Sequence, residues 1–233
     1  MSVLERQRSL DGTVRQLMFS CAKIDPPMPR QNRVNPFSEL IATSARGTLM
    51  GNRGCLHDEH GQIRRAFQGQ RWIICLLEFK NRHNIVMTPG HYTELFFLDE
   101  ATALAAGHRP CAECQRDRFN LFRETWAKAN PDLTTAARPT ATVIDAALHV
   151  ERMAPRTVCH KLDDLPTGTF ITDDDQTAYL VLNHRLLHWA PTGYEDVAQP
   201  TIIFPAQILT PPSMVRALAA GYPVIIHASA LRA

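Results

Sequence analysis

Blocks of apolar residues separated by polar turns predict a mixture of strands and helices. RWIICLLEF at 71–79 is rich in branched and aromatic side chains, and we expect it to form a buried strand. The polar run KNRHN follows, and IVM at 85–87 could return as the second strand of a hairpin. TELFFL at 93–98 predicts a further strand. This part of the chain therefore predicts a small antiparallel sheet.

Two helices are predicted directly after this sheet. Asp99 is a suitable N-cap for a short helix over 100–106. Gly107 suits the left-handed position that often follows a helix C-terminus. A longer helix fits 113–129, where aromatic residues recur at spacings of three and four and form one apolar face. The sheet and the two helices together predict one compact module.

Short strand patterns return after residue 140. GTFIT and AYLVLN flank an acidic DDD turn, LLHW predicts another strand, and VIIH at 224–227 predicts a last one. PPSMVRALAAGY begins with proline and serine and ends with glycine, which is typical of one short helix. We therefore expect a mostly β unit here, joined to the preceding module by a linker or long loop at 132–142.

The bulk composition sets limits on the class of protein. The chain has 233 residues, of which 45% are hydrophobic, enough for the core of one large domain or two small ones. A formal net charge of +2 does not indicate a nucleic-acid partner, so any basic surface must be local. No apolar run approaches the roughly 18 residues of a membrane-spanning helix, and the N-terminus lacks a secretion-signal pattern. We expect a cytoplasmic protein without membrane contact.

The candidate chemistry centres on Cys111 and Cys114, which follow Pro110 and open the second predicted helix. Two intervening residues allow both sulfurs to reach one tetrahedral ion. The partial positive charge of a helix N-terminus favours the thiolate, which is the metal-binding form. A redox Cys-x-x-Cys normally follows a strand, whereas a short helix precedes this pair. The pair therefore predicts half of a zinc (Zn²⁺) site.

A zinc ion needs two more ligands, for which the sequence offers three candidates. Cys55 and His57 lie in MGNRGCLHDEHG, a glycine-punctuated loop suited to bringing ligands together. Cys75 lies in the middle of an apolar strand, where it could equally be a small core residue. We expect four ligands from Cys55, His57, Cys75, Cys111 and Cys114.

The segment FFLDEATALAAGHRPCAECQRD resembles the metal-binding domain at the N-terminus of the Ada DNA-repair methyltransferase. The similarity covers 96–114: an aromatic strand end, an alanine-rich helix, a glycine, then Arg-Pro-Cys-x-x-Cys. It implies a zinc ion held by four cysteines, two of them from an upstream Cys-x-x-x-Cys pair that includes an acceptor of methyl groups from DNA phosphotriesters. This sequence has Cys55-Leu-His57 and Cys75 instead, so the resemblance extends to Cys111 and Cys114 and assigns no acceptor.

Two other interpretations stay open, and with them the question of whether the chain is an enzyme. His57-Asp58-Glu59 followed by the Pro-Cys-x-x-Cys of Cys111 and Cys114 matches the letters of the zinc deaminase signature. Glu59 would then move protons, and water would fill the fourth zinc position, as in a hydrolase. The expected turn and helix contexts differ from those of deaminases. The second alternative is a non-enzymatic, protein-binding scaffold with structural zinc.

Arginines flank the candidate ligands. Arg53, Arg109 and Arg116 could hold phosphates of DNA or RNA beside the helix N-terminus, or they could be solvated charges and partners of nearby acids. We predict an α+β protein with an N-terminal arm at 1–45, an Ada-like zinc-binding module at 46–131, and a mostly β unit at 140–233. In the module, the small antiparallel sheet and two helices would surround the zinc. Its predicted role is on or near nucleic acid, in damage recognition, repair or regulation.

Overall fold

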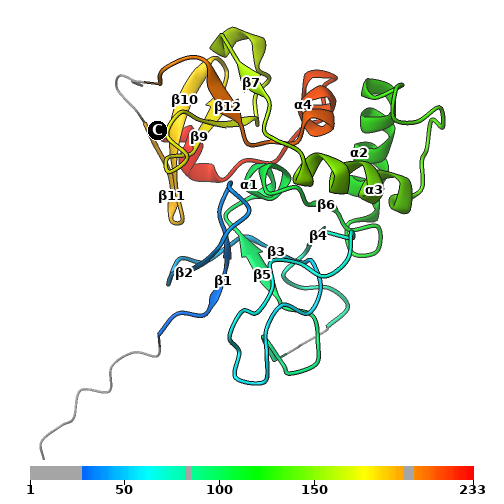
Figure 1. Cartoon of the computed structure of the whole chain (residues 1–233), viewed down its shortest axis with the longest axis vertical. Coiled ribbons are helices and arrows are strands. Elements are labelled where there is room, and N and C mark those ends of the chain that lie inside the picture. Colours follow the sequence, from blue (N-terminus) through cyan, green and yellow to red (C-terminus); the bar gives the residue numbers. More distant parts are fainter. Residues whose placement is uncertain (1–27, 82–84, 197–201) are drawn as a thin grey trace, which may run out of the picture.

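The computed structural model describes residues 28–81, 85–196 and 202–233. Within these residues the chain is mixed α+β, with two six-stranded sheets and four α-helices, which confirms the α+β class of the prediction (Figure 1). The helices are α1 Glu100–Ala105, α2 Arg116–Ala129, α3 Ala141–Met153 and α4 Pro212–Ala219. Two short 3₁₀ turns, Leu162–Asp164 and Ala228–Leu231, complete the helical structure of this part of the chain. None of the helices described is long and apolar enough to cross a bilayer.

The first sheet is mixed rather than purely antiparallel. Its order is β2-β1-β5-β3-β4-β6. The pairs β1–β5 and β4–β6 are parallel, and the other neighbours are antiparallel. Residues 28–45, which were predicted to belong to an N-terminal arm, instead supply two strands of this sheet. The strands are β1 Gln31–Val34, β2 Leu40–Ala42, β3 Leu49–Asn52, β4 Ile73–Cys75, β5 Leu95–Phe97 and β6 Arg109–Pro110.

The second sheet is antiparallel throughout and has the order β11-β10-β9-β8-β12-β7. The predicted strands GTFIT, AYLVLN and LLHW are confirmed as β8, β9 and β10. VIIH at 224–227 forms no strand, because backbone N–H groups there bind the side chains of Asp99 and Glu100. The strands are β7 Val158–Cys159, β8 Phe170–Thr172, β9 Tyr179–Leu182, β10 Arg185–Ala190, β11 Gly193–Asp196 and β12 Ala206–Ile208.

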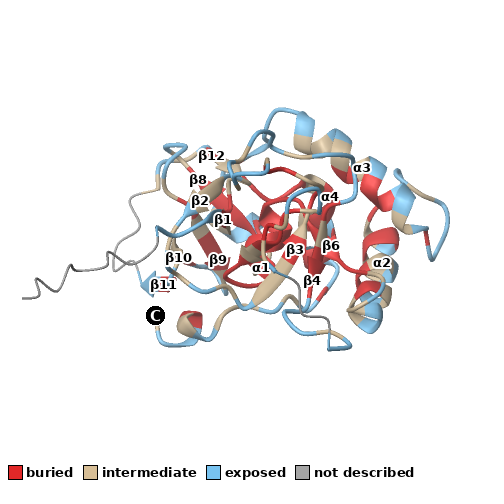
Figure 2. Ribbon diagram, turned by 90° about the horizontal axis from the view of Figure 1, so that it is seen from below, coloured by how far each residue is buried: buried red, intermediate tan, exposed pale blue. Residues whose placement is uncertain are grey.

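Helix α1 begins and ends where its sequence predicts. The Asp99 carboxylate accepts a hydrogen bond of 2.8 Å from Thr102 N, which caps the helix. Gly107 has a φ of +82°, the left-handed conformation that favours glycine. All six residues of α1 are buried, and the helix lies between the two sheets (Figure 1). Figure 2 shows the same feature as a concentration of buried residues around α1.

The structure differs from the prediction in two segments, one between β4 and β5 and the other at α3. The hairpin partner at 85–87 is not a strand: Ile85 is exposed and Met87 has a φ of +61°. β4 pairs with β3 and β6 instead. Helix α3 covers the last two residues of the predicted linker and the start of the predicted mostly β unit, where no helix was expected, and Thr140 caps it by accepting a hydrogen bond from Val143 N.

One core joins the first sheet to three helices. Buried side chains from β1, β5, α2, α3 and α4 form a single apolar cluster, which includes Val34, Phe97, Trp126, Leu148 and Met214. A second cluster joins α1 to the second sheet. The C-terminal helix α4 therefore packs on α2 and contributes to the core beneath the first sheet.

Candidate metal centre

The parallel register of β4 and β6 brings two cysteines together. Ile73 pairs with Arg109 and Ile74 with Pro110, so the next residue on each strand, Cys75 and Cys111, is adjacent as well. The backbone confirms this approach, because Cys111 N donates a 2.9 Å hydrogen bond to the carbonyl of Ile74. Two cysteines that are 36 positions apart in the sequence thus lie side by side.

A turn before α2 adds the third sulfur. Gln115 N donates to the Cys111 carbonyl at 3.2 Å, and its side-chain amide donates to the Ile74 carbonyl at 2.9 Å. These bonds fold 111–115 back over the end of β4. The Sγ atoms of Cys75, Cys111 and Cys114 consequently lie within 4.8 Å of one another.

This spacing suits a tetrahedral metal ion. Zinc–sulfur bonds of about 2.3 Å at tetrahedral angles place sulfurs roughly 3.8 Å apart. Small side-chain rotations bring sulfurs within 4.8 Å of one another to that distance. The three residues could therefore hold a metal ion, and thiolate ligands suit zinc, copper(I) or iron–sulfur chemistry rather than magnesium or calcium.

The three thiols strongly affect one another's protonation. Hydrogen bonds from Cys114 and then Cys75 hold the pKa of Cys111 far below its usual range. The same contact with Cys111 raises the pKa of Cys75 and that of Cys114. The metal-free cluster thus favours one thiolate stabilised by two thiols. A bound cation would replace the remaining protons, so metal affinity would rise with pH.

A cavity of about 370 Å³ lies against the sulfurs. Its floor carries all three cysteines, and its walls are largely apolar and aromatic. Two carboxylates line it: Glu94, which is buried and accepts a hydrogen bond from Met87 N at 2.7 Å, and Glu113, which is exposed. A fourth ligand of a bound ion could therefore be a carboxylate or a molecule from this cavity.

Cys55 and His57 lie outside the three-cysteine group. Cys55 lines a different cavity, and its backbone N–H binds the side chain of Gln68 at 3.0 Å. His57 is buried and uses both ring nitrogens, Nδ1 at 2.6 Å from Thr93 Oγ1 and Nε2 at 3.2 Å from the Thr88 carbonyl. In this conformation the histidine ties its loop to the segment that carries Thr88 and Thr93, and neither ring nitrogen is free to bind a metal.

The predicted deaminase set is also dispersed. The Glu59 side chain is 79% exposed and lies 3.6 Å from His60 Nε2 in a turn, and neither Glu59 nor His57 belongs to the three-cysteine group. His57 and Glu59 therefore do not face Cys111 and Cys114, although the letters of the signature are present.

The three candidate phosphate-binding arginines have different environments. Arg53 is 2% exposed and donates to Ser38 Oγ and to the Ser38 carbonyl at 2.7 and 2.9 Å. Arg109 is equally buried and forms a two-point ion pair with Asp145 at 2.9 and 2.7 Å. Arg116 is exposed at the first residue of α2. In this conformation only Arg116 can reach a phosphate in solvent.

Comparison with known protein families, curated proteins and solved structures gives no significant match to this chain.

Proposed function

We propose that the protein binds zinc through the thiolates of Cys75, Cys111 and Cys114. The observation that supports this is the convergence of three sulfurs from β4, the end of β6 and the turn before α2. A zinc ion there would hold these elements together and contribute folding free energy directly. We favour zinc over other thiolate-binding metals because it is usually four-coordinate. The three cysteines would supply three ligands, and a carboxylate or a water molecule in the adjoining cavity would supply the fourth.

The Ada-like interpretation extends this proposal to nucleic acid. In this chain Cys111 and Cys114 would correspond to the Arg-Pro-Cys-x-x-Cys half of that domain, and Cys75 would serve in place of an upstream cysteine. Arg116 supports the extension, because it is an exposed cation at the N-terminus of α2, two residues from Cys114. The protein would then act on or near DNA or RNA, with its zinc stabilising the contact surface.

A second candidate function is suggested by the cavity beside the sulfurs. Three protein ligands plus a water molecule are the usual arrangement of catalytic zinc, and the cavity gives such a water access to solvent or substrate. Glu94 lines the same cavity and would be the nearby carboxylate able to accept a proton. This version of a zinc hydrolase uses neither His57 nor Glu59.

Metal analysis of single variants tests the binding proposal. The wild-type chain, purified under reducing conditions, should carry about one zinc per chain, and Cys75→Ser, Cys111→Ser and Cys114→Ser should each lose most of it. Cys159→Ser is the matched control, because Cys159 is a buried cysteine on β7 in the second sheet. Full zinc retention in Cys111→Ser would overturn the proposal. Cys55→Ser and His57→Ala decide whether the upstream loop contributes a ligand.

Cobalt substitution separates the structural and catalytic versions. Co²⁺ in a thiolate site absorbs in the visible range, and its spectrum reports changes in coordination. An open or water-filled fourth position should give a new spectrum when azide is added, whereas four protein ligands should leave the spectrum unchanged. An unchanged spectrum would eliminate the hydrolase candidate.

Salt dependence tests the nucleic-acid proposal. Binding of single- or double-stranded DNA should weaken steeply as salt rises, and Arg116→Gln should weaken it further and flatten the salt dependence. Arg138→Gln, which removes an exposed arginine paired with Glu124, is the control. Absent or salt-independent binding would favour the scaffold interpretation.

A further inference from the structure

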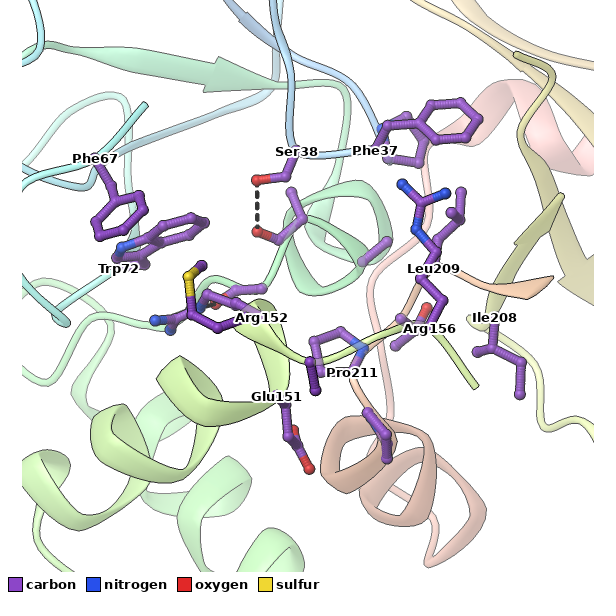
Figure 3. Close-up of a pocket in the computed structure, with 18 of the residues that line it drawn as sticks. Phe37, Ser38, Phe67, Trp72, Glu151, Arg152, Arg156, Ile208, Leu209 and Pro211 are labelled. Atoms are coloured by element: carbon purple, nitrogen blue, oxygen red, sulfur yellow. Dashed lines mark hydrogen bonds between the residues drawn. The ribbon is translucent and has the colours of Figure 1, made fainter. Parts of the chain in front are cut away.

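A second cavity, of about 310 Å³, lies where the two sheets and α3 meet (Figure 3). Its lining comes from the β1–β2 turn, the segment between β3 and β4, the end of α1, the end of α3 and β12 with the segment that follows it. This volume lies at the lower end of the range for small-molecule sites. None of the cysteines of the metal centre borders it.

Aromatic and cationic side chains share its walls. Figure 3 shows Phe67, Trp72 and Arg152 on one side, and Phe37 and Arg156 on the other. The guanidinium of Arg152 lies 4.3 Å from the centre of the Trp72 ring, and that of Arg156 lies 5.4 Å from the Phe37 ring. A flat or apolar ligand body would find rings on both sides, with a positive charge beside each ring.

Two of the cavity's arginines have no acidic partner. Arg53 stacks on Trp72 at 4.6 Å, so this one ring carries two guanidiniums. Among ion pairs between described residues, none includes Arg53 or Arg152. Arg53 Nε and one terminal nitrogen of Arg152 are buried without a hydrogen-bond partner in the described structure. Buried cations are ordinarily paired, so this arrangement lacks a counter-charge.

The neighbouring carboxylates of Asp145 and Glu151 attract Arg152 from a distance, but neither forms an ion pair with it among the described residues. Asp145 is occupied by Arg109. Glu151 binds Ser213 N and Oγ at 2.9 and 2.7 Å, and Figure 3 shows its carboxylate turned away from the cavity centre. Burial raises the pKa of Glu151, while its hydrogen bonds with Ser213 and the charges of Arg216 and Arg152 act in the opposite direction. The cavity therefore keeps a net positive field.

We propose that this cavity binds a small organic anion, a carboxylate or phosphate carried on an apolar or aromatic body. The negative group would lie in the field of Arg53 and Arg152, and the apolar body would lie between the ring pair Phe67–Trp72 and Phe37. Arg156 is at the rim, paired with Asp175 at 2.6 Å, and can exchange that exposed partner for the ligand. The site is independent of the metal centre.

Thermal unfolding of the full chain as purified tests the proposal. The probes are benzoate and phenyl phosphate, with benzyl alcohol as the neutral analogue. At ten times its dissociation constant, a bound anion should raise the melting temperature by about 3–6 °C, while benzyl alcohol should not. The shifts measured over a series of concentrations give a dissociation constant for each anion, and the lower constant identifies whether the group is a carboxylate or a phosphate. No shift with either anion, or an equal shift with the alcohol, overturns the proposal.

Variants locate the effect in the cavity. Arg152→Met should abolish the shift, whereas Arg123→Met should retain it, because Arg123 also stacks on an aromatic ring but lies outside the cavity. If Arg152→Met does not fold, Ala154→Phe decides the question. Ala154 is exposed at the rim, and a ring there fills the cavity while keeping both guanidiniums. A full anion shift in Ala154→Phe would show that the ligand binds elsewhere.

Discussion

The two ends of α1 carry buried polar clusters that differ in charge and in completeness. At the N-terminal end, Asp99 accepts hydrogen bonds of 2.8 Å from Thr102 N and Tyr194 Oη. At the C-terminal end, His108 is fully buried, and neither ring nitrogen has a partner in the described structure. The first cluster resembles a finished part of the core, and the second contains buried groups that still lack partners.

Glu100, which follows Asp99, shows the same difference between the two ends of α1. Glu100 is buried and binds the guanidinium of Arg118 and the hydroxyl of Tyr222, the latter at 2.6 Å. Arg152, at the other end, has a cation–π contact but no carboxylate at ion-pair distance among the described residues. Acidic groups at the start and cationic groups at the end both suit the helix dipole. A favourable position relative to the helix dipole is therefore not enough to stabilise a buried charge, because the group also needs a hydrogen-bond or ion-pair partner.

The largest expected effect is at the complete end. Asp99→Ala removes the cap of α1 and leaves the buried hydroxyl of Tyr194 and the N–H of His227 without their acceptor. We expect a loss of about 3–5 kcal/mol in the free energy of unfolding, measured with urea. Glu59→Ala, at an exposed turn, should change it by less than about 0.5 kcal/mol. A loss below about 1 kcal/mol for Asp99→Ala would show that the hydrogen bonds at the N-terminal end of α1 contribute little to stability.

Two arginines provide a matched comparison of the ends. Arg118 and Arg152 each stack on an aromatic ring, at 4.8 and 4.3 Å, but only Arg118 has a buried carboxylate partner. Arg118→Met should cost about 3 kcal/mol because Glu100 loses its counter-charge. Arg152→Met should cost about 1 kcal/mol, since it removes hydrogen bonds to carbonyls together with an uncompensated charge. Equal losses in the free energy of unfolding for the two variants, measured with urea, would show that the carboxylate partner of Arg118 makes no difference.

The last expected effect concerns pH and vanishes above the ordinary pKa of histidine. Burial, followed by the charges of Arg53 and Arg152, holds the pKa of His108 well below its usual range. Below about pH 6.5 the unfolded chain therefore binds a proton that the folded chain does not, and stability falls as pH decreases. His108→Phe keeps the ring contacts and should reduce this slope by up to about 1.4 kcal/mol per pH unit. Parallel stability–pH curves for the variant and wild type would show that His108 contributes nothing.

Local signals predicted α1 well. Its cap at Asp99 and its stop at Gly107 depend on neighbouring backbone groups, so sequence alone is informative there. Helix α3 was missed because Val143, Val150 and Met153 are exposed, which obscures the narrow buried face formed by Ile144 and Leu148. Amphipathic spacing predicts a helix only when the apolar residues occupy the buried face.

Only two members of the three-cysteine group could be predicted as a pair from the sequence. The pair Cys111 and Cys114 is visible because the two residues lie close in the chain. The position of Cys75 beside them depends on the parallel register of β4 and β6, which no local pattern records. Cys55 and His57 were equally plausible from composition, yet the tertiary fold directs His57 to Thr88 and Thr93.

The spacing of the cysteine group also bears on how the chain is made. All three sulfurs belong to the segment from Cys75 to Cys114, whereas the core around α2 needs α4, which begins at Pro212. During synthesis from the N-terminus, a growing chain therefore acquires its complete thiol set long before that core can close. On the proposal that this group binds a metal ion, the ligands are present on the nascent polypeptide before tertiary packing, so metal supply during translation influences the yield of folded protein.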